Sequence, residues 1–454
     1  MLNKYDITIG LEIHAELNTK SKVFCGCANA YGAAPNTNCC PVCVGMPGSL
    51  PNVNREAVAK TITAGLSVGC TINNVAVFER KNYFYPDLSK SYQISQLVKP
   101  ICIGGGITLK SGKFIRLNRI HLEEDAGKLL HNEVTQQTQI DYNRGGIPLI
   151  EIVTEPDFSC KEEVVEFLEE VRSRLVFSGV ADCKMEEGGM RCDVNLSLKP
   201  AGAKELGNRT EIKNLNSFKM VARAIEHEAN RQADLLANGK RVTTETRKWN
   251  DASGKTTAMR NKEQSQDYRY FPDPDIYAVE ILGKDVDELG KNMPVLAWQL
   301  KERFIKEFGL PEYDASVLTK SKELSNYYLE CVALLDKPKV ISNWILTDVL
   351  KRESFAPAKT LTDIIRMVEG KTITKLVGLD MLDGKVSLTD THGVTDEQIT
   401  DILKNLKAEK PNLVLDFNAN PQKVLPFIIG QVMKATKGRA KSVTIERLTE
   451  EIFK

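Results

Sequence analysis

The sequence predicts an α+β protein in which a largely antiparallel sheet with packed helices is followed by an all-α helical domain and a small helical tail. Three observations predict this order. Apolar and polar residues alternate repeatedly in the first part of the chain, which is typical of strands with one buried face. After Pro294 the spacing becomes that of amphipathic helices, and Pro411 and Pro421 then set apart a last unit.

The chain is too long for one hydrophobic core, since its 454 residues exceed the usual size of a domain. Residues 1–293 hold 23 of the 30 glycines and 10 of the 11 cysteines, and we expect them to form the first domain. Residues 294–400 then form the helical domain. Residues 401–454 form the tail, which carries ten Lys or Arg and six Asp or Glu, a net charge of +4.

The first strand is expected at residues 7–17, where odd positions are apolar and even positions are small or polar. Further alternation predicts strands at residues 119–123, 190–198 and 277–282. These segments account for most of the predicted sheet.

Helices are expected between and after these strands. Ser159 and Glu162 have the spacing of a capping box, an apolar stripe follows, and Gly179 ends that helix. A second helix is expected at about residues 218–236. In the all-α part, apolar stripes predict helices at residues 298–308, 317–335, 341–350 and 361–368.

The composition is that of a globular protein with no strong overall field, since the formal net charge is +1. Any contact with nucleic acid must therefore come from a local patch. The first residues lack the pattern of a signal peptide, and no run of eighteen apolar residues occurs, so we expect a cytosolic protein without a membrane span. Eleven cysteines, an odd number, favour reduced thiols over a disulfide framework.

Four cysteines have the spacing of a metal site. Cys25, Cys27, Cys40 and Cys43 form a C-x-C-x12-C-x2-C pattern whose thiolates can converge on a tetrahedral zinc ion. Four protein ligands leave no open position, so this zinc is structural. The alternative is a set of buried free thiols, and Cys39 is a spare thiol that could enter the site.

Carboxylates and one imidazole from distant segments indicate a second kind of metal site. Glu12 and His14 share a face of the first strand, Glu123 and Glu124 point to opposite faces of theirs, and Glu151 has the phase of apolar neighbours. A carboxylate in such a place must be protonated, paired or bound to a cation. Oxygen-rich ligation favours magnesium and phosphoryl transfer, although ordinary salt bridges remain the alternative.

Two further segments could contact phosphates or bases. Residues 79–87 interleave cations with aromatic side chains, and a β-hairpin with aromatic edges is the alternative. Lys434, Lys437, Arg439 and Lys441 form the densest basic cluster of the tail, and a solvated helix face is the alternative there. The chain has no G-x-x-x-x-G-K-[ST] pattern, so an ATP site would not be a P-loop.

Several motifs in one order resemble a known family, the GatB or B subunits of the aminoacyl-tRNA (Asp/Glu) amidotransferases. The motifs are residues 9–17 (IGLEIHAEL), 25–27 (CGC), 40–43 (CPVC), 45–48 (GMPG), 80–87 (RKNYFYPD), 122–128 (LEEDAGK), 148–153 (PLIEIV), 184–188 (KMEEG) and 267–272 (DYRYFP). The resemblance covers essentially the whole chain, and residues 424–438 resemble the tail motif of YqeY-like proteins.

The resemblance implies a cradle-shaped first domain, a helical domain and a YqeY-like tail, the last two gripping tRNA. It also implies a reaction. ATP and magnesium phosphorylate the side-chain carboxylate of Glu-tRNA(Gln) or Asp-tRNA(Asn), and ammonia then displaces phosphate. The ammonia comes from an amidase subunit (GatA), which with a small subunit (GatC) completes a heterotrimer.

The resemblance also assigns roles to residues. Glu12, His14, Glu123 and Glu151 resemble the magnesium ligands, and Glu124 resembles a polar residue at the mouth of the ammonia path. The lining of that path is carried over to four residues, Lys81, Tyr83, Lys90 and Tyr92. The sequence leaves open the choice between glutamyl and aspartyl tRNA. The competing hypothesis is a zinc-bearing RNA-binding scaffold protein without chemistry of its own.

Overall fold

The computed structural model of the chain describes residues 2–132, 134–259, 268–387, 394–436 and 438–454. The chain divides into two compact units, Met1–Ala297 and Trp298–Lys454. The division lies close to the end of the sheet-rich part of the sequence.

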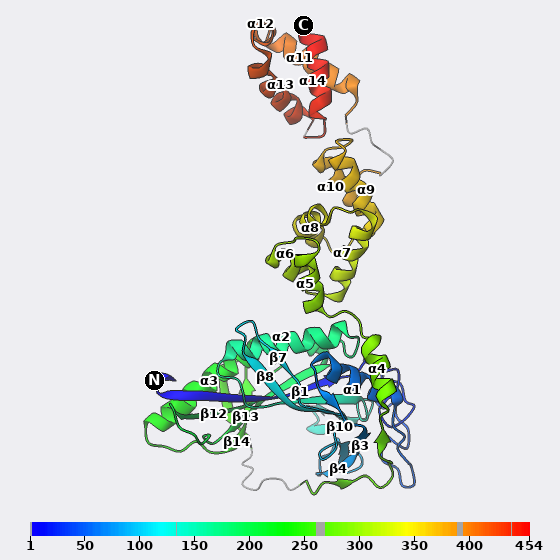
Figure 1. Cartoon of the computed structure of the whole chain (residues 1–454), viewed down its shortest axis with the longest axis vertical. Helices are drawn as coiled ribbons and strands as arrows, with labels where there is room; N and C mark the ends of the chain where they lie inside the picture. The colour runs from blue at the N-terminus through cyan, green and yellow to red at the C-terminus, as the bar shows by residue number, and fades with distance from the viewer. Residues whose placement is uncertain (1, 133, 260–267, 388–393, 437) are drawn as a thin grey trace. The chain divides into compact units, whose positions relative to one another are not determined.

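One large sheet dominates the first unit (Figure 1) and contains ten strands within the described residues. Its spatial order is β15 (Lys255–Ala258), β14 (Glu245–Asn250), β13 (Thr210–Lys213), β12 (Met190–Pro200), β1 (Tyr5–Glu16), β11 (Pro148–Thr154), β8 (Phe114–Glu124), β6 (Cys102–Ile103) and β2 (Thr71–Ile72), and β7 (Gly106–Thr108) also pairs with β8. Only β13 and β14 pair in parallel among these described strands, with a helix in their connection as a parallel pair requires. The predicted fold class, α+β with a largely antiparallel sheet, is confirmed.

Strand β1 lies between β12 and β11 and has two different sides. Ile9, Leu11 and Ile13 are buried, whereas Glu12 and His14 are only partly so. The alternation expected for this strand is therefore confirmed. Because side chains on paired strands keep to the same side in register, the whole centre of the sheet has one apolar and one polar face.

Three helices cover the apolar face. They are α1 (Arg55–Ser67), α2 (Lys161–Phe177) and α3 (Phe218–Ala237), and α2 and α3 lie along one side of the sheet in Figure 1. Their buried side chains join those of β1, β8, β11 and β12 in one hydrophobic core. Phe158 and Phe167 meet edge to face in that core, with ring centroids 5.1 Å apart.

The start of α2 differs from the expected capping box. The helix begins at Lys161 after Cys160, and Ser159 donates from its backbone N–H to Glu163 Oε2 at 2.8 Å instead of pairing with Glu162. The predicted box is wrong because the chain enters the helix one position later than the sequence pattern indicates. The end of the helix is as expected, since Gly179 follows it with a positive φ of 73°.

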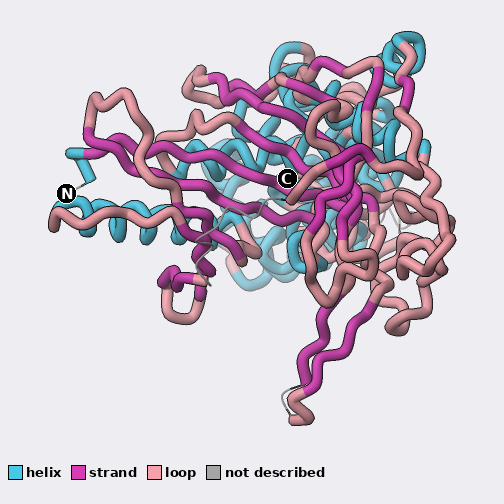
Figure 2. Tube along the Cα trace, turned by 90° about the horizontal axis from the view of Figure 1, so that it is seen from below, coloured by secondary structure: helices cyan, strands magenta, loops and turns pink. Residues whose placement is uncertain are grey.

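Smaller pieces surround the sheet. They are the hairpin of β9 (Lys128–Asn132) and β10 (Gln137–Asp141), the three-stranded sheet of β16 (Phe271–Pro272), β4 (Glu79–Asn82) and β5 (Tyr92–Ser95), the pair β17 (Val279–Glu280) and β3 (Val75–Ala76), helix α4 (Gly283–Lys291), and the 3₁₀ turns Leu2–Lys4 and Met185–Glu187. The β9–β10 hairpin projects from the body of the unit in Figure 2.

The second unit is helical throughout its described residues. Its helices are α5 (Ala297–Lys306), α6 (Glu312–Leu318), α7 (Lys322–Leu334), α8 (Pro338–Thr347), α9 (Ala358–Glu369), α10 (Lys375–Leu382), α11 (Asp396–Glu409), α12 (Asn412–Ala419), α13 (Pro421–Ala435) and α14 (Ser442–Phe453), with a 3₁₀ turn at Val349–Lys351. The last four form a small core of their own. Helix α11 begins at Asp396 with a capping box between Thr395 and Gln398.

Within the described residues, no helix is long and apolar enough to cross a membrane.

The core predicts a stability test. We expect Phe167→Ala to lower the free energy of unfolding by about 4 kcal/mol, because it removes a fully buried ring and leaves a cavity. Phe84→Ala removes the same ring from a residue that is 77% exposed. This change should alter the free energy of unfolding by less than about 0.5 kcal/mol. Chemical denaturation of the full chain measures both. Equal effects would contradict this description of the core.

Candidate functional site

The polar face of the sheet brings three of the expected magnesium ligands together. His14 on β1 pairs in register with Glu151 on β11, and Glu123 comes from β8 on the far side of β11. His14 Nε2 lies 3.4 Å from Glu151 Oε2 and 3.7 Å from Glu123 Oε1. One ligand atom from each residue lies within 4.8 Å of the others, which suits a single cation. We call His14, Glu123 and Glu151 the first acidic group.

His121 belongs beside this group, although the sequence did not single it out. Its Nε2 lies 3.5 Å from both Glu123 Oε2 and Glu151 Oε2, and its side chain is almost fully buried. Its position two residues before Glu123, on the same strand face, was the available signal.

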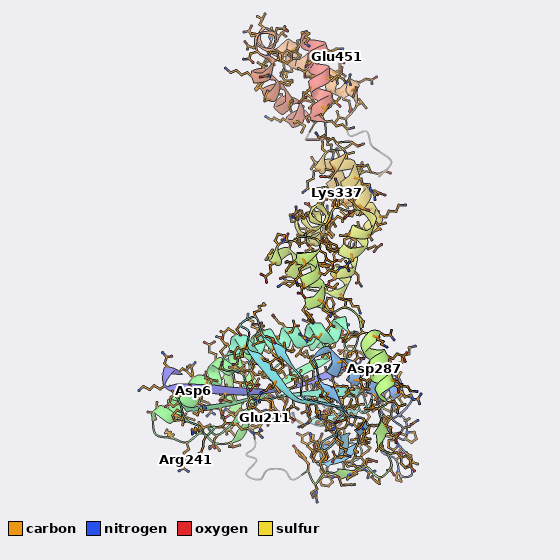
Figure 3. All side chains as sticks on the ribbon, in the orientation of Figure 1. Asp6, Glu211, Arg241, Asp287, Lys337 and Glu451 are labelled. Atoms are coloured by element: carbon orange, nitrogen blue, oxygen red, sulfur yellow. The ribbon has the colours of Figure 1, made fainter. Side chains whose placement is uncertain are left out.

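Glu12, the fourth expected ligand, faces a different set of partners. It forms a second acidic group with Asp193 on β12 and Glu211 on β13, again with ligand atoms within 4.8 Å of one another. Asn195 Nδ2 donates to Glu12 Oε1 at 3.0 Å. Figure 3 shows Glu211 on the side of the sheet away from α2. Glu12 was predicted from the sequence as a site residue, whereas Asp193, Glu211 and Asn195 were not.

A lysine lies inside the second acidic group. Lys213 Nζ is 2.5 Å from Asp193 Oδ2 and 2.8 Å from Glu211 Oε1. Burial would lower the pKa of Lys213, but these two carboxylates outweigh burial and raise it. The lysine therefore stays charged and offsets part of the negative charge.

The pKa values of Glu12 and Glu151 shift in opposite directions. Burial raises the pKa of Glu12, and the negative charges of Glu151 and Glu211 raise it further. Burial also acts to raise the pKa of Glu151, yet the imidazoles of His121 and His14 outweigh it and lower that pKa below the ordinary range. Burial acts to lower the pKa of His14, but the hydrogen bond and charge of Glu151 outweigh burial and raise that pKa.

An ion-pair network lies next to the first acidic group. Asp125 accepts from Arg144 Nε at 2.7 Å and from Arg191 Nη2 at 2.9 Å, and Arg191 is the register partner of His14. Burial acts to raise the pKa of Asp125, but the two guanidinium groups outweigh it and lower the pKa. Glu16, 3.6 Å from Arg144, has its pKa raised to about 7 by burial and by the charge of Asp125.

The residues expected along the ammonia path lie on β4, β5 and the turn between them. Lys90 Nζ pairs with Glu124 Oε2 at 2.6 Å, and the same carboxylate accepts from the Ile94 N–H. Lys81 Nζ lies 5.7 Å from the ring centroid of Tyr83, and Lys90 Nζ lies 5.5 Å from that of Tyr92.

Lys81 interacts electrostatically with Glu123 and Glu151 of the first acidic group. Burial would lower its pKa, but Glu123 and the other charges around it raise the pKa instead. The alternative interpretation of this segment, a hairpin with aromatic edges, also describes it well, because β4 and β5 pair directly.

The four cysteines of the metal pattern come together. Cys25, Cys27, Cys40 and Cys43 place their sulfur atoms within 4.8 Å of one another, and Cys40 Sγ to Cys43 Sγ is 3.9 Å. Four sulfur ligands at about 2.3 Å from a tetrahedral zinc lie about 3.8 Å apart, so the set fits zinc. The pKa of Cys43 falls to about 4, mainly through Cys25. Cys39 is outside the set, with its sulfur 3.7 Å from Asn143 Oδ1.

A cleft of about 460 Å³ opens beside Glu12. It has the size of a small-ligand site, and its lining combines polar and apolar groups. Its lining residues are Thr8, Gly10, Leu11, Glu12, Val153, Thr154, Pro156, Asn195, Ser197, Leu206, Gly207, Asn208, Arg209 and Thr244.

The basic residues of the tail differ in their surroundings. Lys434 is exposed on α13, and Lys441 is partly buried at the start of α14. Arg439 pairs with Asp380 at 2.7 Å. Lys437 lies outside the described residues.

Carboxylates and imidazoles gathered on one sheet face beside a cleft are typical of enzymes that use divalent cations on phosphorylated substrates. Comparison with known sequences identifies the family. A profile described as the GatB/GatE catalytic domain matches residues 7–287, and one described as a GatB domain matches residues 326–452. The chain belongs to the GatB family, the B subunits of tRNA-dependent amidotransferases, and the expected resemblance is confirmed.

Curated relatives agree with this assignment. The chain is 45% identical to the B subunit of the aspartyl/glutamyl-tRNA(Asn/Gln) amidotransferase of Caldicellulosiruptor saccharolyticus, with 99% of this chain and 100% of the relative aligned. Proteins of the same name from Thermoanaerobacter sp. and Ruminiclostridium cellulolyticum are 42% and 44% identical, over 99% and 98% of this chain and 100% and 96% of theirs.

The network around Asp125 predicts a pH-dependent effect. Because the folded-state pKa of Asp125 is lowered, its stabilisation is present above the ordinary pKa of about 4 and is lost as the pH falls below it. We expect Asp125→Asn to lower the free energy of unfolding by about 2 kcal/mol at pH 7. The difference from wild type should shrink towards pH 3.

Urea denaturation at several pH values measures this difference. Asp182→Asn, at an exposed position, is the matched control and should have little effect. A difference for Asp125→Asn that is constant from pH 7 to pH 3 would contradict the assigned role.

Proposed function

We propose that this chain phosphorylates the side-chain carboxylate of a glutamate or aspartate misacylated to tRNA, using ATP, and then passes the activated acyl group to ammonia. The first acidic group is the observation that carries the proposal. A carboxylate is a poor acyl donor because its leaving group would be oxide. Transfer of the γ-phosphoryl group creates a phosphate leaving group, and the nitrogen of ammonia then forms the amide bond while the acyl–phosphate bond breaks.

Phosphoryl transfer to a carboxylate brings several negative charges together, and residues of this chain are suited to offset them. The reacting carboxylate and the triphosphate are both anions, and they must approach each other beside Glu123 and Glu151. His14, Glu123 and Glu151 would hold magnesium, which supplies charge stabilisation for the phosphoryl oxygens when bound. His121 would orient the carboxylates of Glu123 and Glu151, since its Nε2 lies 3.5 Å from an oxygen of each.

We propose that Glu12 helps to bind ATP. The cleft beside it is large enough for part of a nucleotide, and Gly207 and Asn208 offer backbone and amide groups at its rim. The second acidic group would bind a cation that the phosphates bring with them. Lys213, which pairs with Asp193 and Glu211, would then donate a hydrogen bond to a phosphate oxygen. This position gives an ATP site without a P-loop.

Ammonia is proposed to arrive past the side chains of β4 and β5. Lys81, Tyr83, Lys90 and Tyr92 form a polar and aromatic wall, and the Lys90–Glu124 pair would act as a polar gate at its mouth. The ammonia would come from an amidase subunit, with a small third subunit completing the complex. Structural zinc on the four cysteines would hold the loop between β1 and α1.

The competing hypothesis, a zinc-bearing RNA-binding scaffold, needs no inward carboxylates. Five acidic side chains in two adjacent groups would repel the phosphates of RNA unless cations intervene. This observation favours the enzyme. A purified complex that binds tRNA but shows no magnesium-dependent ATP turnover would support the scaffold instead.

The first acidic group predicts a loss of activity. With the amidase partner present, Glu151→Gln should reduce ATP hydrolysis and amide formation on misacylated tRNA by about 100-fold or more, because one charged ligand is lost. It should also raise the magnesium concentration needed for half-maximal activity. Glu169→Gln, an identical change at an exposed position on α2, is the control and should retain full activity. Full activity of Glu151→Gln would reject the metal assignment.

The tail predicts a loss of tRNA affinity. We expect Lys434→Gln combined with Lys441→Gln to weaken tRNA binding and to reduce its salt dependence, with ATP hydrolysis in the absence of tRNA unchanged. Lys404→Gln combined with Lys423→Gln makes the same change of charge at exposed positions elsewhere in the tail. Equal losses from both pairs would show that the effect is one of net charge and not of this cluster.

A further inference from the structure

A lysine beside the four cysteines is fully buried. Lys22 has an exposed fraction of 0%, and its Nζ donates to the backbone oxygen of Tyr142 at 3.2 Å. In the described part of the chain Lys22 forms no ion pair with a carboxylate. An ammonium group in such a place loses its hydration, and one carbonyl oxygen does not replace it.

The cysteine cluster lies close to this lysine. A Cβ atom added to Gly146 would lie 3.5 Å from Lys22 Cδ and 3.7 Å from Cys43 Cβ. These two carbons are therefore at most 7.2 Å apart. The backbone N–H of Lys22 also donates to the Cys27 oxygen at 3.0 Å. The lysine is therefore attached to the cluster through its main chain, and its side chain passes near Cys43.

The charge of a filled site explains the burial of Lys22. Four thiolates around one divalent ion carry a net charge of −2, and that excess is confined to a small, partly buried volume. We propose that Lys22 is the built-in counter-cation of this site and that its charge sets how tightly the four cysteines hold zinc. The proposal rests on zinc occupying the site, as suggested above, and not on the chemistry at the first acidic group.

The charge of Lys22 should matter more in the zinc-loaded protein than in the zinc-free protein. With zinc, the positive charge of Lys22 is offset by the anionic site. Without zinc, the cysteines carry a smaller net negative charge than the filled site does, so removing the charge of Lys22 should cost the fold less than it does with zinc bound. A lysine that only held the Tyr142 carbonyl would stabilise both forms equally.

The experiment uses the full chain with three changes. Lys22→Gln removes the charge and keeps a donor for Tyr142, Lys22→Arg keeps the charge, and Lys20→Met removes a charge from an exposed neighbour. Zinc content is measured by metal analysis, and zinc affinity by competition with a chromophoric chelator. Thermal unfolding is followed with zinc bound and after zinc removal.

We expect wild type to bind about one zinc and Lys22→Gln to bind it roughly 10- to 100-fold more weakly. Lys20→Met should match wild type, and Lys22→Arg should remain closer to wild type than Lys22→Gln. Relative to wild type, Lys22→Gln should lose less thermal stability in the zinc-free protein than in the zinc-bound protein.

Three results would overturn the proposal. They are unchanged zinc affinity in Lys22→Gln, an equal loss of thermal stability with and without zinc, or a wild-type chain that takes up no zinc. If Lys22→Gln does not fold, Lys22→Met decides by the same measurements. Failure of both to fold even in zinc-free form would show a structural role and would also overturn it. None of these results depends on ATP turnover, so the proposed function is tested separately.

Discussion

The pairing of β1 with β11 on one side and β12 on the other is the interaction on which the structure depends. It puts an apolar row against helices α1 to α3 and, by the same alternation, a row of charged side chains on the opposite face. Glu12 and His14 cannot leave that face without moving Leu11 and Ile13 out of the core. The burial of the apolar side thus offsets the cost of crowding carboxylates on the other.

Each group of carboxylates on this face lies beside a basic side chain. His121 lies beside Glu123 and Glu151, Lys213 lies between Asp193 and Glu211, and two arginines hold Asp125. The chain therefore tolerates a highly acidic face before any metal or nucleotide binds. A ligand that brings its own cations exchanges one source of positive charge for another, which keeps the face compatible with an anionic substrate.

Much of this could be predicted from the sequence, and the remainder could not for definable reasons. The period of two predicted the faces of β1 and the opposite directions of Glu123 and Glu124. Cysteine spacing predicted a cluster that the structure brings together. Glu12 and His14 also share a face, as expected, but they meet different neighbours because the first faces β12 and β13 and the second faces β11 and β8. Strand order and register decide this, and neither is visible in local spacing. The burial of Lys22 was likewise out of reach, because it depends on Tyr142, more than a hundred residues away.

The central place of β1 also governs how the chain can be made. This strand is synthesised well before its two partners, which begin at residues 148 and 190. At about 5–20 residues per second, β1 waits on the order of ten to forty seconds for its second neighbour. During that time at least one of its edges is unpaired, so this strand is open to pairing with other chains while the protein is being made.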